Sequence, residues 1–178
     1  MRRRILLTGL PGCGKTTVVR KVADLLRGVA SGFYTEEIRD DRGQRIGFQV
    51  ISLEGKRGEL ARKGTGSGPR VGSYCVNVKD FERIALPSLE VEGRKVLLID
   101  EIGKMECFSK EFVRRVEKAF DSNTSILATV PLRGGGDAID KIRRRKDAEP
   151  ILVTPENRDE LPEQLAAMLT SGGRSAKV

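Results

Sequence analysis

The segment that most constrains the fold of this chain is GLPGCGKTT at residues 9–17. It completes the pattern G-x-x-x-x-G-K-[ST] through Gly9, Gly14, Lys15 and Thr16. Glycines at these places let consecutive backbone N–H groups converge on a polyphosphate, and the start of the helix that follows adds positive potential. The lysine reaches the β- and γ-phosphate oxygens, and the threonine hydroxyl ligates Mg²⁺. The segment therefore predicts a loop that holds a magnesium-bound polyphosphate.

The residues on either side give this loop the setting that it needs. Residues 3–8 are a short apolar run typical of a strand, and residues 15–27 carry apolar side chains at helical spacing. The alternative is a glycine-rich turn that only happens to precede a helix. That alternative is disfavoured, because the lysine, the threonine and the strand–loop–helix setting occur together.

A second motif, RKVLLIDEIG at residues 94–103, is an apolar run that ends in two acids. Such a run is typical of a parallel strand that is buried on both faces. Asp100 follows the run, where an aspartate commonly completes the metal shell, so we predict that it holds Mg²⁺ together with Thr16. Glu101 comes next, where a carboxylate can take a proton from, or orient, a water that attacks the γ-phosphorus. The alternative for Glu101 is a solvated acid at a strand end.

The rest of the chain predicts alternating strands and helices. Residues 30–62 combine β-branched and aromatic residues with turn signals, which indicates an antiparallel meander, and glycine-rich residues 63–74 predict a flexible surface loop or, less favoured, a substrate-facing lid. Helices are expected at 80–90, 111–120, 138–145 and 159–169, a buried strand at 125–131 and a last strand at 150–155. This alternation predicts one α/β domain over residues 1–178, with a mainly parallel sheet flanked by helices.

Composition narrows the chemistry. The chain has no histidine, and its three cysteines form no CxxC pair, so the sequence excludes histidine acid–base chemistry and predicts neither a disulfide framework nor a usual zinc site. No apolar run reaches the roughly 18 residues that span a bilayer, and we expect a soluble, cytoplasmic protein. The net charge of +8 is spread along the chain, which disfavours nucleic acid as a partner. High charge with few Asn, Gln, Met and Cys residues is typical of proteins from thermophiles.

Four further features are weaker candidates. Thr129 lies near the end of a predicted strand, where its hydroxyl could hold the γ-phosphate or the attacking water, or could simply reflect β-propensity. Arg133 is a candidate to neutralise transition-state charge. Cys13 lies in the phosphate loop close to Lys15, a setting that favours a reactive thiolate, although a small residue that merely fits is the favoured alternative. The basic run at residues 141–146 is either a solvated helix face or, less favoured, a nucleic-acid contact.

Taken together, these segments resemble the small nucleoside-triphosphatases described from thermophiles, whose human relative is called cancer-related nucleoside-triphosphatase. Beyond the phosphate loop, the resemblance rests most on GFYTEEIR at residues 32–39 and DEIGKME at residues 100–106. It implies a RecA-like P-loop fold in which extra antiparallel strands join the sheet. It also implies Mg-dependent hydrolysis of ATP, GTP, CTP and UTP with little base preference and release of orthophosphate.

Carried over by motif, the resemblance predicts that residues 9–16 and 97–104 line the nucleotide site, with Lys15 and Glu101 as catalytic residues. The predicted lining residues are Gly9, Leu10, Pro11, Gly12, Cys13, Gly14, Lys15, Thr16, Leu97, Leu98, Ile99, Asp100, Glu101, Ile102, Gly103 and Lys104. Lys104 is expected either to reach phosphate or to pair with Glu106.

Several points stay open at this level. Residues 35–37 and 156–158 have no assigned role, and neither oligomeric state nor the physiological substrate follows from the sequence. A small-molecule kinase is the nearest alternative, because the same phosphate loop opens many kinases of this size, although Glu101 favours water as the acceptor. A nucleotide-gated RNA-binding module is a third possibility, suggested by the basic run and the net charge.

Overall fold

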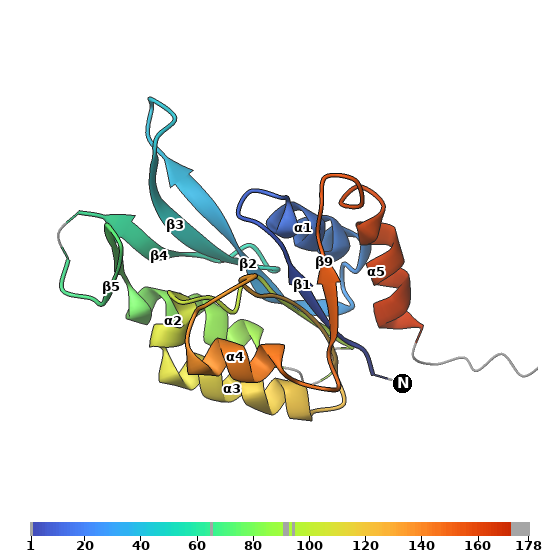
Figure 1. Cartoon of the computed structure of the whole chain (residues 1–178). Helices are drawn as coiled ribbons and strands as arrows, with labels where there is room; N and C mark the ends of the chain where they lie inside the picture. The colour runs from blue at the N-terminus through green and yellow to red at the C-terminus, as the bar shows by residue number, and fades with distance from the viewer. Residues whose placement is uncertain (1, 65, 91–92, 94, 172–178) are drawn as a thin grey trace, which may run out of the picture.

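A mixed sheet runs through the computed structural model, which describes residues 2–64, 66–90, 93 and 95–171 (Figure 1). Over these residues the sheet has nine strands in the order β5-β6-β4-β3-β2-β7-β8-β1-β9. The strands are β1 (Arg4–Thr8), β2 (Ala30–Arg39), β3 (Arg45–Ser52), β4 (Arg57–Lys63), β5 (Arg70–Val71), β6 (Tyr74–Val76), β7 (Val96–Ile99), β8 (Ser125–Thr129) and β9 (Glu149–Leu152). The helices are α1 (Lys15–Leu25), α2 (Val78–Ser88), α3 (Lys110–Asp121), α4 (Asp137–Arg143) and α5 (Leu161–Thr170), with a 3-10 turn, η1, at Glu106–Phe108.

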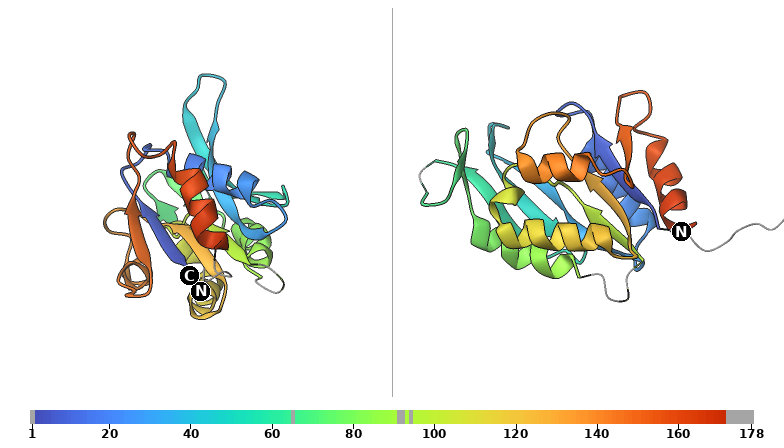
Figure 2. Two further views of the ribbon diagram at one scale, coloured as in Figure 1. Left: turned by 90° about the vertical axis from the view of Figure 1, so that its right-hand side faces the viewer. Right: turned by 60° about the horizontal axis from the view of Figure 1, so that its bottom comes forward.

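Strands β2, β7, β8, β1 and β9 form the parallel half of the sheet. Helices α1 and α5 cover one face, and α2, α3 and α4 lie against the other (Figures 1 and 2). The four residues of β7 are fully buried, and they alternate between the two apolar clusters on the opposite faces. This confirms the predicted strand that is buried on both sides, and with it the α/β fold.

The antiparallel half consists of β2, β3, β4, β6 and β5, paired in that order. The β2–β3 hairpin projects from the body of the molecule (Figure 1). Strand β2 pairs antiparallel with β3 and also parallel with β7. The first strand of the predicted meander therefore belongs to both halves of the sheet.

Residues 63–74, predicted to form a flexible loop, contain the short strand β5, which pairs with β6. Arg70 Nη2 donates a hydrogen bond to the Gly64 carbonyl oxygen at 2.8 Å, and Gly72 makes the turn with a φ of +57°. The glycine-rich sequence hides this strand because only two residues pair. The predicted helices are present, with α2 carrying Pro87 in its last turn.

Three phenylalanines pack helices α2 and α3 against β2, the strand that belongs to both halves of the sheet. Phe33 of β2, Phe81 of α2 and Phe112 of α3 pack with ring centroids 5.2 to 5.8 Å apart. All three rings are buried. Edge-to-face aromatic pairs add about 0.5–1.5 kcal/mol each beyond area burial, so this cluster fixes β2 against α2 and α3.

None of the helices in the described ranges is long and apolar enough to cross a membrane.

We predict that Phe81→Ala lowers the free energy of unfolding by about 3–5 kcal/mol, because it removes the ring that joins α2 to this cluster. Phe108→Ala is the matched control: Phe108 is 37% exposed, and its loss is expected to cost about 1 kcal/mol or less. Urea unfolding followed by circular dichroism measures both values. Equal losses in the two variants would contradict the role given to the cluster.

Candidate functional site

The phosphate loop joins β1 to α1, and its backbone requires glycine. Gly14 caps α1 with a φ of +110°. At Gly9, a Cβ atom would lie 2.7 Å from Cys13 Sγ and 2.8 Å from the Val153 carbonyl oxygen. Lys15 Nζ donates hydrogen bonds to the carbonyl oxygens of Gly9 (2.9 Å) and Leu10 (3.1 Å), so the loop curls around this ammonium group. The first N–H groups of α1 have no acceptor within the helix, which makes its start an anion-binding position.

Asp100 is held at the end of β7 by two hydroxyl groups. Thr16 Oγ1 donates a hydrogen bond to Asp100 Oδ2 at 2.7 Å, and Thr129 Oγ1 donates one to Asp100 Oδ1 at 2.6 Å. Burial raises the pKa of Asp100, while the hydrogen bonds from Thr129 and Thr16 stabilise the carboxylate and oppose that rise. The predicted metal-ligand pair, Thr16 and Asp100, is thus brought together by the fold.

Two more carboxyl groups lie directly beyond Asp100. A Cβ atom placed on Gly103 would lie 2.5 Å from Glu101 Oε1 and 2.6 Å from Glu106 Oε2, so both carboxyl groups converge on this glycine. Burial and the neighbouring charge of Asp100 raise the pKa of Glu101 to about 7. Burial, followed by the charge of Glu101, raises the pKa of Glu106 well above its ordinary value. The site therefore contains a carboxyl group that can exchange a proton near neutral pH.

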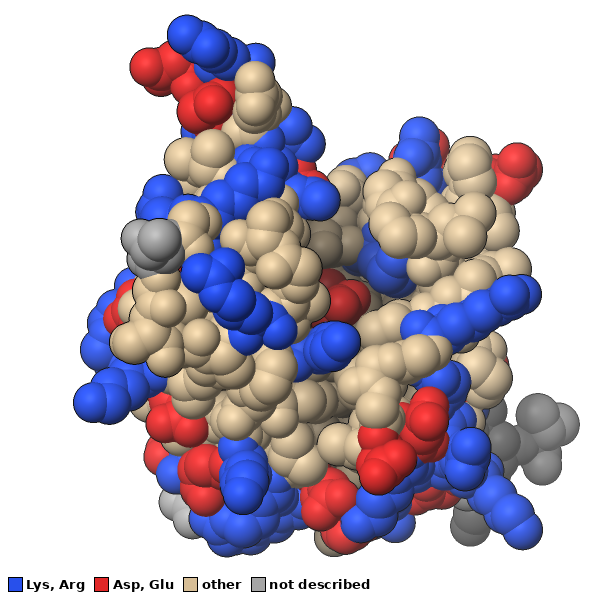
Figure 3. All heavy atoms as spheres, turned by 60° about the vertical axis from the view of Figure 1, so that its left-hand side comes forward, with Lys and Arg blue, Asp and Glu red and all other residues tan. Residues whose placement is uncertain are grey.

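These groups open into a cleft of about 680 Å³ at the carboxyl ends of the parallel strands. Figure 3 shows a hollow in this face, with acidic side chains at its floor and basic side chains around it. One end of the cleft is lined by Pro11, Gly12, Gly14, Lys15, Thr16, Thr17, Asp100, Glu101 and Lys104. The other end is lined by Thr35, Glu36, Glu37, Phe48, Leu60, Val71, Met105 and Glu106.

Some predicted lining residues do not reach the cleft. Leu97, Leu98 and Ile99 are fully buried inside β7, and Ile102 is 2% exposed. They form the floor beneath the site. The prediction included them because the motif was carried over as a whole, together with the strand that ends beside Asp100. Thr129 is also fully buried, with its hydroxyl donated to Asp100, so the predicted direct contact with phosphate or water is corrected to a contact with the Asp100 carboxylate.

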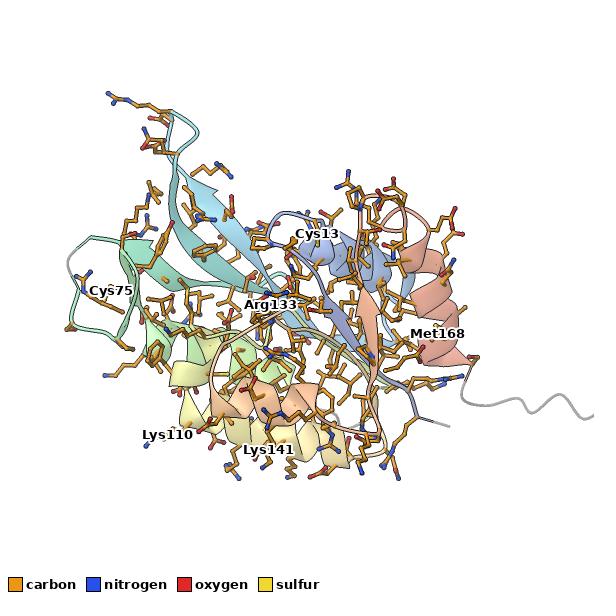
Figure 4. The ribbon with its side chains drawn as sticks, in the orientation of Figure 1. Cys13, Cys75, Lys110, Arg133, Lys141 and Met168 are labelled. Carbon is orange, nitrogen blue, oxygen red and sulfur yellow. The ribbon has the colours of Figure 1, made fainter. Side chains whose placement is uncertain are left out.

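Arg133 and Cys13 lie outside the cleft lining. Figure 4 places Arg133 on the loop between β8 and α4, where its side chain is exposed. Cys13 is half-buried in the phosphate loop, with its Sγ 3.9 Å from Lys15 Nζ. The reactivity of this thiol stays a prediction.

The basic run is largely neutralised by neighbouring acids. Lys141 pairs with Glu117 at 2.7 Å, and Arg143 pairs with Asp140 at 2.9 Å. Arg145 contacts Asp121 at 3.0 Å and Asp147 at 2.9 Å. Three of the five basic residues at 141–146 are therefore engaged by acids within the chain.

Sequence reasoning missed the second end of the cleft. Thr35 and Glu37 come from β2, Phe48 from β3, and Leu60 from β4. The only signal was GFYTEEIR, which was part of the resemblance but had no assigned role. Arg158 was also unassigned: its Nη1 donates a hydrogen bond to the Cys13 carbonyl oxygen at 3.5 Å, and its Cδ would lie 3.2 Å from a Cβ on Gly14.

Another cleft, of about 710 Å³, is lined by the last turns of α1 and α2, the start of β2 and the turn between β3 and β4. Its arginines are paired with acids: Arg20 with Glu36 at 2.9 Å, Arg27 with Asp24 at 3.2 Å and Arg83 with Asp80 at 2.7 Å. It lies away from the phosphate loop, so the functional site is assigned to the first cleft.

The chain is similar to known proteins over most of its length. A family model described as NTPase matches residues 4–166. Nucleoside-triphosphatase THEP1 from Thermotoga sp. (strain RQ2) is 44% identical over 168 residues, covering 93% of this chain and 95% of the relative. Cancer-related nucleoside-triphosphatase from Homo sapiens is 44% identical over 178 residues, covering 90% of this chain and 93% of the relative. The crystal structure of THEP1 from the hyperthermophile Aquifex aeolicus has a TM-score of 0.86 at 43% identity, covering 94% of this chain and 99% of that chain.

The buried Glu106 predicts a pH-dependent stability. The pKa of Glu106 in the folded protein lies above its pKa in the unfolded chain. Its contribution to the free energy of unfolding is therefore fully present below the unfolded pKa and is lost as pH rises through the folded pKa. Glu106→Gln removes this loss, because the amide does not ionise. We therefore expect the free energy of unfolding of the variant, relative to wild type, to increase from pH 5 to pH 8. Urea unfolding at both pH values measures it, with Glu163→Gln on the exposed part of α5 as the control, and a difference that stays constant would contradict the expectation.

Proposed function

Because the chain belongs to the NTPase family, as its motifs predicted, we propose that it hydrolyses nucleoside triphosphates to nucleoside diphosphates and orthophosphate. The observation that supports this most is the partly buried Glu101, which lies in the same cleft as the phosphate loop and directly follows Asp100. A hydrolase needs a group that activates water beside the γ-phosphate, and a carboxylate in this position can accept the proton of that water.

Mg²⁺ is the cofactor that we propose. Thr16 and Asp100 place a hydroxyl and a carboxylate oxygen 2.7 Å apart at the phosphate loop. Mg²⁺ commonly binds one or two carboxylates together with substrate phosphates, without a complete cage of protein ligands. This fits the part of the chain that the structure describes, in which no group of three His, Cys, Asp or Glu side chains could hold a metal. When bound, Mg²⁺ would offset the negative charge of the β- and γ-phosphates.

The other groups in the cleft are proposed to have separate roles in catalysis. The start of α1 and the Lys15 ammonium group stabilise negative charge on the transferred phosphoryl group. Glu101 takes a proton from the attacking water, and a pKa of about 7 suits a base that works near neutral pH. Thr129 acts through Asp100, because its hydroxyl fixes the orientation of that carboxylate.

We place the nucleoside on the side of the phosphate loop away from Glu101. Arg158, on the segment between β9 and α5, approaches that side of the loop. Leu10, in the phosphate loop, and Leu152, at the end of β9, are 67% and 52% exposed. A guanidinium plane and aliphatic side chains contact any base without distinguishing hydrogen-bond patterns, which supports broad acceptance of ATP, GTP, CTP and UTP.

Lys104 and Arg133 are proposed to meet the γ-phosphate. Lys104 already lines the phosphate end of the cleft. Arg133 is followed by three glycines with positive φ, at residues 134–136, so its loop is free of the restrictions that side chains impose. The nucleotide-gated RNA-binding module has less support, because three of the five basic residues in the run at 141–146 are paired with acids.

Replacement of the base tests the mechanism. Glu101→Gln is expected to keep binding of Mg-nucleotide but to lower kcat by about 10²–10⁴-fold, because an amide cannot accept the proton. In wild type, kcat is expected to fall as pH drops through about 7, where Glu101 becomes protonated, and this acid limb should be absent in the variant. Phosphate release and equilibrium binding of a non-hydrolysable nucleotide measure the two effects. Glu117→Gln on α3 is the control, and full turnover in Glu101→Gln would exclude the role.

Substrate range is tested by measuring phosphate release from ATP, GTP, CTP and UTP, with Mg²⁺, with EDTA, and with added RNA. We expect kcat/KM values within about 10-fold of one another, because the proposed base contacts discriminate weakly. EDTA should abolish turnover, excess Mg²⁺ should restore it, and RNA should leave the rate unchanged. Hydrolysis of a single nucleotide, or dependence on RNA, would refute the proposed range.

A further inference from the structure

We propose that the end of the cleft formed by the antiparallel strands is a second binding site, which takes a neutral nucleoside as an alternative acceptor of the γ-phosphoryl group. The side chains of Phe48, Leu60, Val71 and Met105 line this end and are called the acceptor wall below. The proposal rests on the function proposed above, because it uses the same phosphate loop and the same Glu101. In this second reaction, the donor that is otherwise hydrolysed gives its γ-phosphoryl group to an organic hydroxyl.

The cleft extends well beyond the phosphate loop. Its volume is about 680 Å³. Residues of the phosphate loop line only one end, and the acceptor wall, with Thr35 and Glu37, lines the other. The second end therefore has room for a molecule besides the attacking water.

A bound triphosphate would leave this end free. The strand order β2-β7-β8-β1-β9 places the phosphate loop, which follows β1, between β7 and β9. A triphosphate whose γ-phosphate faces Glu101, at the end of β7, extends along the loop toward β9 and Arg158. It thus runs away from β2 and from the acceptor wall.

The acceptor wall presents a fixed aromatic ring. Phe48 packs against Tyr74 with ring centroids 5.2 Å apart, and the Arg45 guanidinium lies 5.2 Å from the Phe48 ring centre. Arg45 Nε also donates a hydrogen bond to the Tyr74 hydroxyl at 2.9 Å, which holds the cluster together. A ring fixed in this way can stack a planar base at little cost in conformational entropy. The Thr35 hydroxyl and the Glu37 carboxylate are suited to bind sugar hydroxyl groups.

The charge of the cleft favours a neutral acceptor over a nucleotide. The acids that line it are Glu36, Glu37, Asp100, Glu101 and Glu106, and among the described lining residues only Lys15 and Lys104 are basic. Arg45 is engaged by Glu37 at 3.0 Å and by Tyr74. A nucleoside monophosphate would bring two further negative charges to a cleft whose described lining contains no arginine to receive them.

The proposed transfer balances without another reactant. The oxygen of the primary hydroxyl forms a bond to the γ-phosphorus, and the bond from that phosphorus to the β–γ bridging oxygen breaks. The hydroxyl proton passes to the Glu101 carboxylate. The products are a nucleoside diphosphate and a nucleoside 5′-monophosphate.

The test incubates the full chain with ATP and Mg²⁺, alone and with millimolar adenosine, guanosine, cytidine, uridine or thymidine. ADP, orthophosphate and phosphomonoester are quantified by ³¹P NMR. With at least one nucleoside, ADP is expected to exceed orthophosphate, with the difference recovered as phosphomonoester. Phe48→Leu should lower the ratio of phosphomonoester to orthophosphate by about 3- to 10-fold, because it removes the stacking ring but keeps an apolar side chain. Leu25→Ala, at an exposed position at the end of α1, is the control and should leave the ratio unchanged.

Equal amounts of ADP and orthophosphate with all five nucleosides would overturn the acceptor site while leaving hydrolysis intact. Absence of orthophosphate from the reaction without nucleoside would instead contradict the proposed hydrolysis. An unchanged ratio of phosphomonoester to orthophosphate in Phe48→Leu would also overturn the site. So would a raised KM for ATP in Phe48→Leu measured without nucleoside, because it would place the base of the donor against Phe48. Val71→Ala, near the edge of the sheet, repeats the measurement if Phe48→Leu does not fold.

Discussion

The buried carboxylate of Asp100 is the interaction on which the arrangement of the cleft depends. It accepts hydroxyl hydrogen bonds from Thr16 at the start of α1 and from Thr129 at the end of β8, and a backbone hydrogen bond from Thr35 of β2. A carboxylate taken out of water is stable only when its oxygens are satisfied in this way. The phosphate loop, the parallel sheet and the antiparallel strands are therefore held at fixed positions around one charge.

The phosphate end of this cleft could be predicted from short-range patterns. The glycines, Lys15 and Thr16 act within a single loop and helix turn, so their spacing alone determines where they lie. The apolar run before Asp100 likewise indicated a strand buried on both faces, and burial of all four residues of β7 confirms it. Glu101 and Lys104 follow this run within four residues of Asp100, and the structure places both in the same cleft.

The other end could not be predicted, because it depends on pairing between distant segments. Thr35 reaches the cleft only because β2 pairs in parallel with β7, and Phe48 only because β3 then pairs with β2. Neither partner is encoded by local periodicity, since a strand carries the same pattern whichever strand lies beside it. The same reason explains the errors at Leu97 and Thr129: nearness to a motif in sequence does not tell which side chains face the cleft and which support it from beneath.

The way in which the long sheet ends has a consequence for its solubility. On one side it stops at β5, which has two residues, and on the other at β9, which has four and contains Pro150. Short strands and a proline offer few unpaired N–H groups in a row, so a strand from another molecule finds little to pair with. The added antiparallel strands thus enlarge the cleft without giving the sheet an aggregation-prone border.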